Sequence, residues 1–364
     1  MVSVATDALL ARRPPVVQQL LGSRSQVCLL NSKDIFAVLK NEPVIVMACN
    51  TRIKHVIPGI MRAAQELDAV VAFELARSEC SLEGGYTGFT PQLYVQTVLE
   101  YAEATGFTKP FFIHADHITV KSTAPEAIAS ARQLIEAQLA AGYTSFAIDA
   151  SFNELPDNIR ITTELAQPII AQNYGLEVEV GEIKSAGQEA EITTVAEAVE
   201  FITGLRQNGV YPELLAINNG SKHGNYLEGE QIFIDLERTG EIYQAIKDYG
   251  VCIAQHGVTG TPLHLVGRFA DYGIRKANVG TQWQSIAHAG LPEDLLAEMR
   301  AWAAANQKDI KFATKPFKDR IDQIPAAYRE KIAEMAYREA KEFIQAFRAV
   351  GTASKVAAGL AAKA

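Results

Sequence analysis

Residues 110–141 read PFFIHADHITVKSTAPEAIASARQLIEAQLAA and combine two periodicities in one unit. The apolar run that starts at Pro110 ends in polar residues at His117, as a strand covered on both faces does when it reaches a polar edge. From Pro125 to Ala141 apolar residues recur at helical spacing, and proline suits the first turn of a helix. A buried strand followed at once by a helix is the repeating unit of a parallel α/β sheet.

The same unit recurs along the chain. The predicted strands are Val44–Asn50, Ala69–Ala76, Pro110–His117, Ser145–Ser151, Leu176–Ile183, Leu214–Ser221, Val251–Gly257 and Gly273–Gly280. The predicted helices are His55–Leu67, Pro91–Ala104, Pro125–Ala141, Leu155–Tyr174, Thr194–Asn208, Glu230–Tyr249, Pro262–Tyr272, Trp283–Asn306 and Ala326–Val350. Eight such units in series predict a TIM (β/α)8 barrel. The alternative, an open doubly wound sheet, usually carries a glycine-rich loop after its first strand, and Asn50-Thr51-Arg52-Ile53 is not one.

The 364 residues suit one large barrel with helical extensions at both ends. We expect an N-terminal helical extension over residues 1–40, with Pro14 and Pro15 opening a helix near Val16–Leu21. The barrel is expected to cover residues 41–350. Residues 351–364 are rich in alanine and are expected to form a flexible tail.

The composition restricts the classes of binding partner and the cellular compartment that we expect. A net charge of -8 argues against a nucleic-acid partner, which requires clustered basic residues. The four cysteines show no CxxC spacing, which disfavours a disulfide framework and fits a reducing, cytoplasmic compartment. The sequence has neither a secretory signal pattern nor an apolar run of about 20 residues, so we expect no membrane partner.

The predicted strand ends are rich in metal-ligand residue types, and barrel active sites form at the carboxyl ends of the strands. These residues are His114, Asp116, His117, Asp149, Glu177, Glu179, His223 and His256. Three neutral imidazoles can hold Zn²⁺ with an open position, from which the metal polarises a carbonyl. Asp116 is expected to point away from His117 and to move a proton without binding the same metal. A lone strand-end histidine is more often structural, but burying several together on one rim is costly.

Glycine-rich segments at the ends of the last three predicted strands are a second indication of function. The segments are Gly220–Gly224, His256–Pro262 and Asn278–Thr281. Small residues let backbone N–H groups approach an anion, and barrels commonly bind phosphate near strands seven and eight, so we expect a phosphorylated substrate. A Schiff-base mechanism stays open through Lys184, Lys222 or Lys276, although a surface or phosphate-facing lysine is the more common role.

These residues resemble a known family, the class II (metal-dependent) fructose-bisphosphate and tagatose-bisphosphate aldolases, over Pro43–Phe347. The resemblance rests on an ordered set: Ala48–Asn50, His114–His117, Ile148–Ser151, Glu177–Gly181, His223–Tyr226, His256–Gly257 and Lys276–Thr281. It implies a lyase that cleaves or forms a C–C bond in a ketose (bis)phosphate, giving dihydroxyacetone phosphate or a similar ketone plus an aldehyde. It also implies a homodimer or homotetramer.

The resemblance assigns roles to individual positions. It implies catalytic Zn²⁺ on His117, His223 and His256, and a second divalent metal or support site at His114, Asp149 and Glu179. It implies proton transfer by Asp116 and a proton relay at Glu189. It implies substrate or phosphate binding, with a monovalent cation nearby, by Asn50, Glu74, Gly224, Gly257, Thr259, Asn278 and Thr281.

The sequence also departs from the family pattern around the substrate pocket. Glu74 takes the place of a serine after strand two, Val258-Thr259 replaces Gly-Ser, and Gly280 replaces an aspartate. The segment Gly84–Pro91 resembles the non-catalytic Z subunits of tagatose-bisphosphate aldolases, whose relatives include sugar-acid epimerases. Two alternatives therefore stay open, a metal-dependent epimerase of a sugar or sugar acid and a non-catalytic partner subunit of an aldolase.

Overall fold

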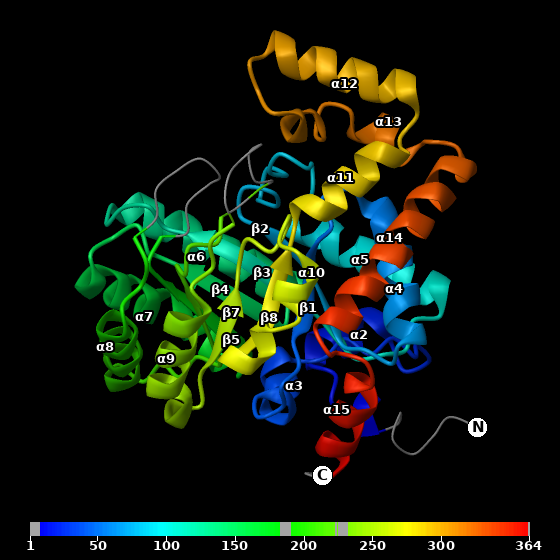
Figure 1. Ribbon diagram of the computed structural model, residues 1–364. Helices are drawn as coiled ribbons and strands as arrows, with labels where there is room; N and C mark the ends of the chain where they lie inside the picture. Colours follow the sequence, from blue (N-terminus) through cyan, green and yellow to red (C-terminus); the bar gives the residue numbers. More distant parts are fainter. Residues whose placement is uncertain (1–7, 183–190, 223, 225–231, 363–364) are drawn as a thin grey trace.

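The computed structural model describes residues 8–182, 191–222, 224 and 232–362, and it forms a closed eight-stranded barrel (Figure 1). The strands are β1 (Val46–Asn50), β2 (Val71–Ala76), β3 (Phe111–Thr119), β4 (Ser145–Asp149), β5 (Gly175–Val180), β6 (Leu214–Ile217), β7 (Cys252–Gln255) and β8 (Ile274–Val279). Each strand pairs in parallel with the next, and β1 pairs with β8. This closure confirms the predicted TIM barrel and excludes the open sheet.

Helices alternate with the strands along the chain, and most of them surround the barrel (Figure 1). They are α4 (Ile57–Glu66), α5 (Pro91–Thr105), α6 (Pro125–Ala141), α7 (Leu155–Ala171), α8 (Val195–Gln207), α9 (Leu236–Ile246), α10 (Leu263–Val266), α11 (Thr281–Gly290), α12 (Glu293–Ala305), α13 (Lys318–Asp322) and α14 (Ala326–Ala346). Short 3-10 turns lie at Lys54–Val56, Lys247–Tyr249, Phe269–Tyr272 and Ile310–Ala313. The single helix predicted over Trp283–Asn306 is two helices, because Leu291 is extended before Pro292.

The inward-facing positions of the strands change from apolar to polar along the barrel axis. On β3, Phe112 lies with the apolar interior cluster near the amino ends of the strands, and every second residue after it points the same way. His114 and Asp116 are therefore the next two inward positions toward the carboxyl-end mouth. On β8 the inward positions are Lys276 and Asn278, because Lys276 pairs with Val46 of that cluster. The inward-facing positions of the strands thus supply apolar residues at the bottom of the barrel and polar residues at its mouth.

The floor of the barrel is closed by α3 (Ser32–Leu39), which follows α2 (Pro15–Leu21) in the predicted N-terminal helical extension. Phe36 of α3 stacks edge-on against Phe112, with ring centroids 5.8 Å apart. The apolar plug keeps water out of the lower barrel, so polar chemistry is confined to the opposite end.

The C-terminal segment differs from its predicted flexible state. Residues Thr352–Ala361 form α15, with Val356 and Leu360 buried in the cluster that includes α3. A Cβ on Gly359 would lie 2.7 Å from a methyl of Val38, so the glycine allows the two helices to approach closely. Apolar residues at helical spacing find a surface on α3, which composition alone did not indicate, and this part of the tail expectation is wrong.

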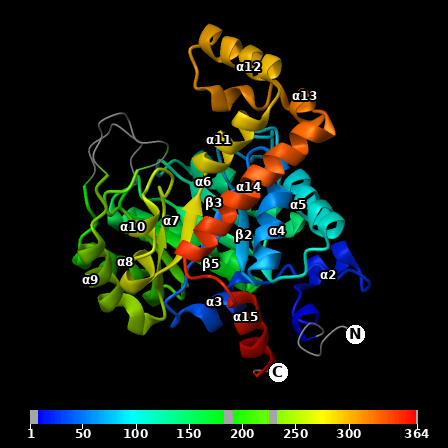
Figure 2. The ribbon, with the colours of Figure 1, turned by 45° about the vertical axis from the view of Figure 1, so that its right-hand side comes forward.

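An extension of helices rises beside the mouth of the barrel. Figures 1 and 2 show α11 rising from the mouth of the barrel and α12 and α13 standing away from it, before α14 returns alongside α4. A Cβ on Gly59 of α4 would lie 2.0 Å from the carbonyl oxygen of Ala333, so α14 packs tightly on α4. In the described part of the chain no helix is both long enough and apolar enough to span a membrane.

Candidate metal centre and active-site pocket

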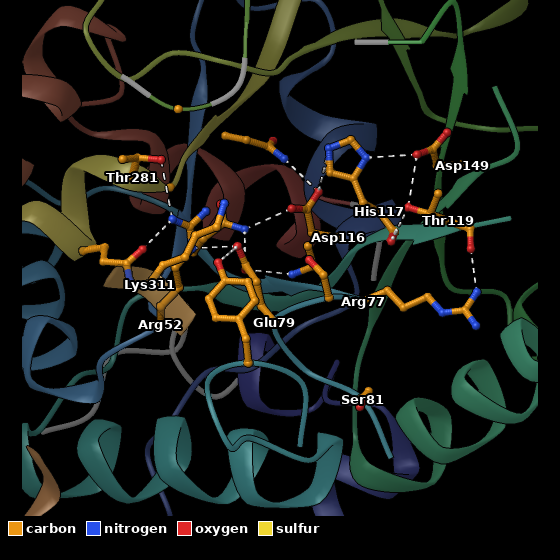
Figure 3. Close-up of a pocket in the computed structure, with 18 of the residues that line it drawn as sticks. Arg52, Arg77, Glu79, Ser81, Asp116, His117, Thr119, Asp149, Thr281 and Lys311 are labelled. Carbon is orange, nitrogen blue, oxygen red and sulfur yellow. Dashed lines mark hydrogen bonds and ion pairs between the residues drawn. The ribbon is translucent and has the colours of Figure 1, made fainter. Parts of the chain in front are cut away.

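A pocket of about 1280 Å³ opens at the carboxyl ends of the strands (Figure 3). The predicted site residues that line it are Asn50, Asp116, His117, Asp149, Glu179, Gly224, Gly257, Thr259, Asn278 and Thr281. His256 lies just beneath it and contacts His117. Two predicted residues, Glu74 and His114, are fully buried deeper in the barrel. His223 and Glu189 lie outside the described residues.

The backbone of β3 is irregular where Asp116 and His117 sit. His117 has φ 39°, and the β3–β4 register shifts between Ala115 and Ile118. In a regular strand successive side chains point to opposite faces, but a bulge re-aims one of them. His117 Nε2 consequently lies 4.0 Å from Asp116 Oδ1. The expectation that these two side chains point to opposite sides is therefore wrong.

Two imidazoles meet at the pocket floor, with His117 Nε2 and His256 Nδ1 2.8 Å apart. The outer nitrogen of each ring faces carboxylate. His117 Nδ1 lies 3.2 Å from Glu179 and 3.3 Å from Asp149, and His256 Nε2 lies 2.7 Å from Glu177. A ring that donates its outer N–H to a carboxylate turns a lone pair inward, which is the usual orientation of a metal-binding histidine.

The two inward lone pairs require a positive charge between them, either a proton or a metal ion. Burial alone would lower the pKa of His117, but the carboxylates of Asp116 and Glu179 raise it well above its ordinary value. The same negative environment attracts a divalent cation. The donor types, imidazole nitrogen and carboxylate oxygen, are those that Zn²⁺ takes in proteins, so the described residues fit a metal ion here.

Two groups of candidate metal ligands share His117. His117, Asp116 and His256 offer ligand atoms within 4.8 Å of one another, and so do His117, Asp149 and Glu179. Burial and the neighbouring Asp149 raise the pKa of Glu179 to about 8.

His114 does not join Asp149 and Glu179, as the resemblance implied. It lies three residues earlier on the same strand, and its Nδ1 is 2.7 Å from Ser145 Oγ in the barrel interior. The structure thus assigns His117, rather than His114, as the partner of these two carboxylates.

Asp116 is held by two asparagine amides. Asn50 Nδ2 donates to its Oδ2 at 2.9 Å, and Asn278 Nδ2 donates to its Oδ1 at 3.0 Å. Burial would raise the pKa of Asp116, but nearby His117, His256 and Lys276 lower it well below its ordinary range. The carboxylate is therefore ionised, fixed in one orientation and located at the pocket, as a proton-transfer group must be.

Beneath Asp116 lies a fully buried lysine. Lys276 Nζ donates to Asn278 Oδ1 at 2.6 Å and pairs with Glu177 at 3.0 Å and Glu74 at 3.2 Å. Lys276 is therefore neither a surface nor a phosphate-facing residue, and Glu74 pairs with it instead of lining the pocket. The alternation of side chains along β8 and β5 predicts this burial, because Lys276 and Glu177 occupy inward-facing positions of their strands.

The glycine-rich ends of β7 and β8 form the opposite wall of the pocket. Gly257 has φ 67°, and a Cβ there would lie 2.4 Å from the carbonyl oxygen of Lys222, so only glycine fits. The first turn of α11 begins at Thr281 in this wall, and the Gln282 N–H donates to Thr259 Oγ1 at 3.2 Å. A helix N-terminus with adjacent glycines and hydroxyls suits an anion.

Arg52 and Glu79 also line the pocket, although neither was predicted as a site residue. Arg52 Nε pairs with Glu79 Oε1 at 2.6 Å, and the Tyr86 hydroxyl donates to the same oxygen at 3.1 Å. Asn50 Nδ2 donates to Glu79 Oε2 at 3.1 Å, so Glu79 orients an amide that holds Asp116. Tyr86 belongs to the segment Gly84–Pro91 that the sequence marked as unusual, whereas Arg52 and Glu79 carry no local motif.

The barrel and its imidazole–carboxylate cluster define a metal-dependent TIM-barrel enzyme. Residues 30–352 match the family described as fructose-bisphosphate aldolase class-II, which covers most of the chain, and the protein therefore belongs to this family. The predicted family and enzyme class are confirmed: the protein is a metal-dependent lyase of the aldolase type, which cleaves C–C bonds.

Curated relatives agree with this assignment, and solved structures share the fold. The fructose-bisphosphate aldolase of Geobacillus stearothermophilus is 28% identical over 245 residues, covering 66% of this chain and 76% of the relative. That of Streptococcus pneumoniae serotype 4 is 26% identical over 280 residues, covering 75% and 86%. The YdjI aldolase from Escherichia coli K12 shares the fold, with a TM-score of 0.62 at 19% identity over 89% of this chain and 99% of the other.

A second solved structure shows the same fold. The putative fructose-1,6-biphosphate aldolase from Coccidioides immitis superposes with a TM-score of 0.64 at 19% identity, covering 89% of this chain and 98% of the other.

Proposed function

We propose that the enzyme is a zinc-dependent aldolase that cleaves a ketose phosphate into a phosphorylated ketone, such as dihydroxyacetone phosphate, and an aldehyde. One observation carries the proposal. His117 and His256 turn their inner nitrogens toward each other, 2.8 Å apart, beside the ionised Asp116. This arrangement supplies cation ligands and a base at one point of one pocket.

His117 and His256 would hold the zinc ion together with His223, which the family resemblance implies and which directly precedes the pocket residue Gly224 in sequence. When bound, the metal polarises the ketone carbonyl and stabilises the negative charge that develops on its oxygen. A second divalent ion at Asp149 and Glu179, and a monovalent cation near the phosphate, remain predictions.

The protein's own groups move the protons. In cleavage, Asp116 accepts the proton of the hydroxyl on the carbon that becomes the aldehyde, and in condensation it returns that proton. Asn50 and Asn278 keep the accepting oxygens in place at 2.9 and 3.0 Å. Glu189 is our candidate for the proton on the ketone carbon, by resemblance alone.

The phosphate of the ketone fragment would lie against Gly224, Gly257, Thr259 and Thr281, where backbone N–H groups and the α11 N-terminus favour an anion. Asn278 instead serves Asp116, and Glu74 serves Lys276. We also propose a cytoplasmic homo-oligomer without nucleic-acid or membrane partners, in line with the sequence composition.

Three measurements on the purified chain test the proposal. Elemental analysis should find zinc, a chelator should abolish activity, and zinc should restore it. A screen of ketose mono- and bisphosphates should yield two carbon fragments, whereas an epimerase would conserve carbon number and a partner subunit would be inert alone. Full turnover in excess chelator, with elemental analysis showing no bound metal, would refute the mechanism.

A further inference from the structure

Arg52 follows β1 by two residues and lies in the pocket wall, with 13% of its side chain exposed. Its guanidinium is held through two of its three nitrogens. Nε pairs with Glu79 at 2.6 Å, and Nη1 donates to Gln284 Oε1 of α11 at 2.9 Å and to Thr281 Oγ1 at 3.5 Å. Nη2 donates to no acceptor in residues 8–182, 191–222, 224 or 232–362, so its N–H groups remain open to a ligand.

Gly280 provides the space in front of that nitrogen. A Cβ at this position would lie 3.0 Å from Arg52 Nη2 and 3.3 Å from Asn50 Oδ1. The backbone does not require glycine here, because φ is -115°, a value that other residues adopt readily. The aspartate usual at this position in the family would place a carboxylate against the guanidinium. In this chain Gly280 has no side chain to occupy that position.

The surrounding charge favours an anion at that position. Gly280 is the N-cap of the ten-residue helix α11, whose first turn has no acidic residue and whose cap makes no side-chain hydrogen bond. The partial positive charge of the helix N-terminus therefore adds to that of Arg52. Glu79 does not cancel this field fully, because its carboxylate also accepts from Tyr86, Asn50 and the Ala76 N–H.

We infer that Arg52 is a specificity-determining residue, which binds the phosphate of the ketone fragment through Nη2 in the space that Gly280 leaves. The inference rests on the proposed function and deepens it, because Arg52 Nη2 and the space left by Gly280 together form one anion contact. The ligand class is a phosphate monoester held between a guanidinium and a helix N-terminus.

The test measures the ketone half-reaction, so that it does not depend on the unknown aldehyde. The zinc-loaded enzyme is incubated in D₂O with dihydroxyacetone phosphate or with unphosphorylated dihydroxyacetone, and proton exchange is followed by NMR. The readout is the ratio of kcat/KM for the two ketones. In the wild type the phosphorylated ketone should be strongly preferred.

Two variants test the contact, and each changes one of its two residues. Arg52→Lys keeps a positive charge beside Glu79 but removes the second guanidinium nitrogen, and Gly280→Asp fills the space with a carboxylate. Each should lower the ratio by about 10- to 100-fold, the value of a charge-assisted hydrogen bond. The matched control is Arg132→Lys, on α6, which pairs with Glu164 outside the pocket and should leave the ratio unchanged. Thermal melting confirms that each variant is folded.

A second readout separates this inference from the proposed function. Inorganic phosphate is titrated into the metal-free protein by calorimetry, and both pocket variants should weaken its binding. Exchange that depends on zinc, with an unchanged ketone ratio and unchanged phosphate affinity in both variants, would overturn the role of Arg52. Absence of exchange in the wild type, with phosphate binding that still requires Arg52, would overturn the aldolase mechanism and keep the anion site.

Discussion

Replacing Lys276 with methionine removes an ammonium group that contacts two buried carboxylates. Lys276, Glu74 and Glu177 have exposures of 0%, 0% and 1%, and the ammonium lies 3.2 and 3.0 Å from the two glutamates. Burial alone would lower the pKa of Lys276, but Glu177 and Glu74 raise it above its ordinary value, so the ion pair persists at neutral pH. Removing one partner of a buried ion pair typically costs about 3–5 kcal/mol.

Lys276→Met should therefore lower the free energy of unfolding by about 3–5 kcal/mol, measured by urea denaturation of the zinc-free protein at pH 7. The deficit should grow as pH rises. Burial raises the pKa of Glu74 above 4.5 and Lys276 opposes that rise, so without Lys276 the carboxyl favours its protonated form more strongly. The stability from that protonated form is present below pH 4.5 and is lost as pH rises through the folded-state pKa, where the variant has no ammonium to compensate the charge.

Two further variants control the experiment. Lys355→Met breaks an exposed pair with Glu42, whose side chains are 46% and 38% exposed, and should cost at most about 1 kcal/mol. Adding Glu74→Gln to Lys276→Met should recover part of the loss, because one stranded charge is removed. If Lys276→Met unfolds within about 1 kcal/mol of the wild type, the buried charge network does not stabilise the barrel as argued.

Other consequences of the structure are also measurable. Asp116→Asn should reduce kcat by about 10²- to 10⁴-fold while bound zinc, measured by elemental analysis, stays at the wild-type level; equal loss of metal would show a ligand role instead. Burial lowers the pKa of His288 from 6.5 to about 4, so its neutral form contributes stability that is present above pH 6.5 and lost as pH falls toward 4. His288→Gln should abolish roughly 2 kcal/mol of the stability change between pH 7 and 5, measured by urea unfolding at both pH values, and an unchanged pH dependence would contradict this role of His288. Leu360→Ala, in the buried face of α15, should cost about 2–3 kcal/mol by thermal or urea unfolding, and a neutral result would return the tail to its predicted flexible state.

Much of the metal cluster was predictable from the sequence because barrel topology brings the strand ends to one rim. Asp116, His117, Asp149 and His256 were predicted as strand-end residues, and the structure places them at one pocket. Parallel strands in a closed barrel all end at the same face. Residues that are far apart in the chain therefore lie close together when each follows the carboxyl end of a strand.

Local backbone geometry was not predictable in the same way. Asp116 and His117 are neighbours, and strict alternation would separate them, but the bulge on β3 with φ 39° at His117 brings both to the mouth. The residue types in this segment do not predict the bulge. It arises where β3 and β4 change register, which is a property of two strands and not of one.

The sequence by itself determined the fold and the identity of the metal-ligand types, because hydrophobic periodicity and the order of polar strand ends are written along the chain. Only the tertiary structure decided how the charges are partnered. It showed that Lys276 compensates Glu74 and Glu177 in the interior, and that Arg52 reaches the space above Gly280. Such pairings depend on distances across the barrel, which spacing in sequence does not encode.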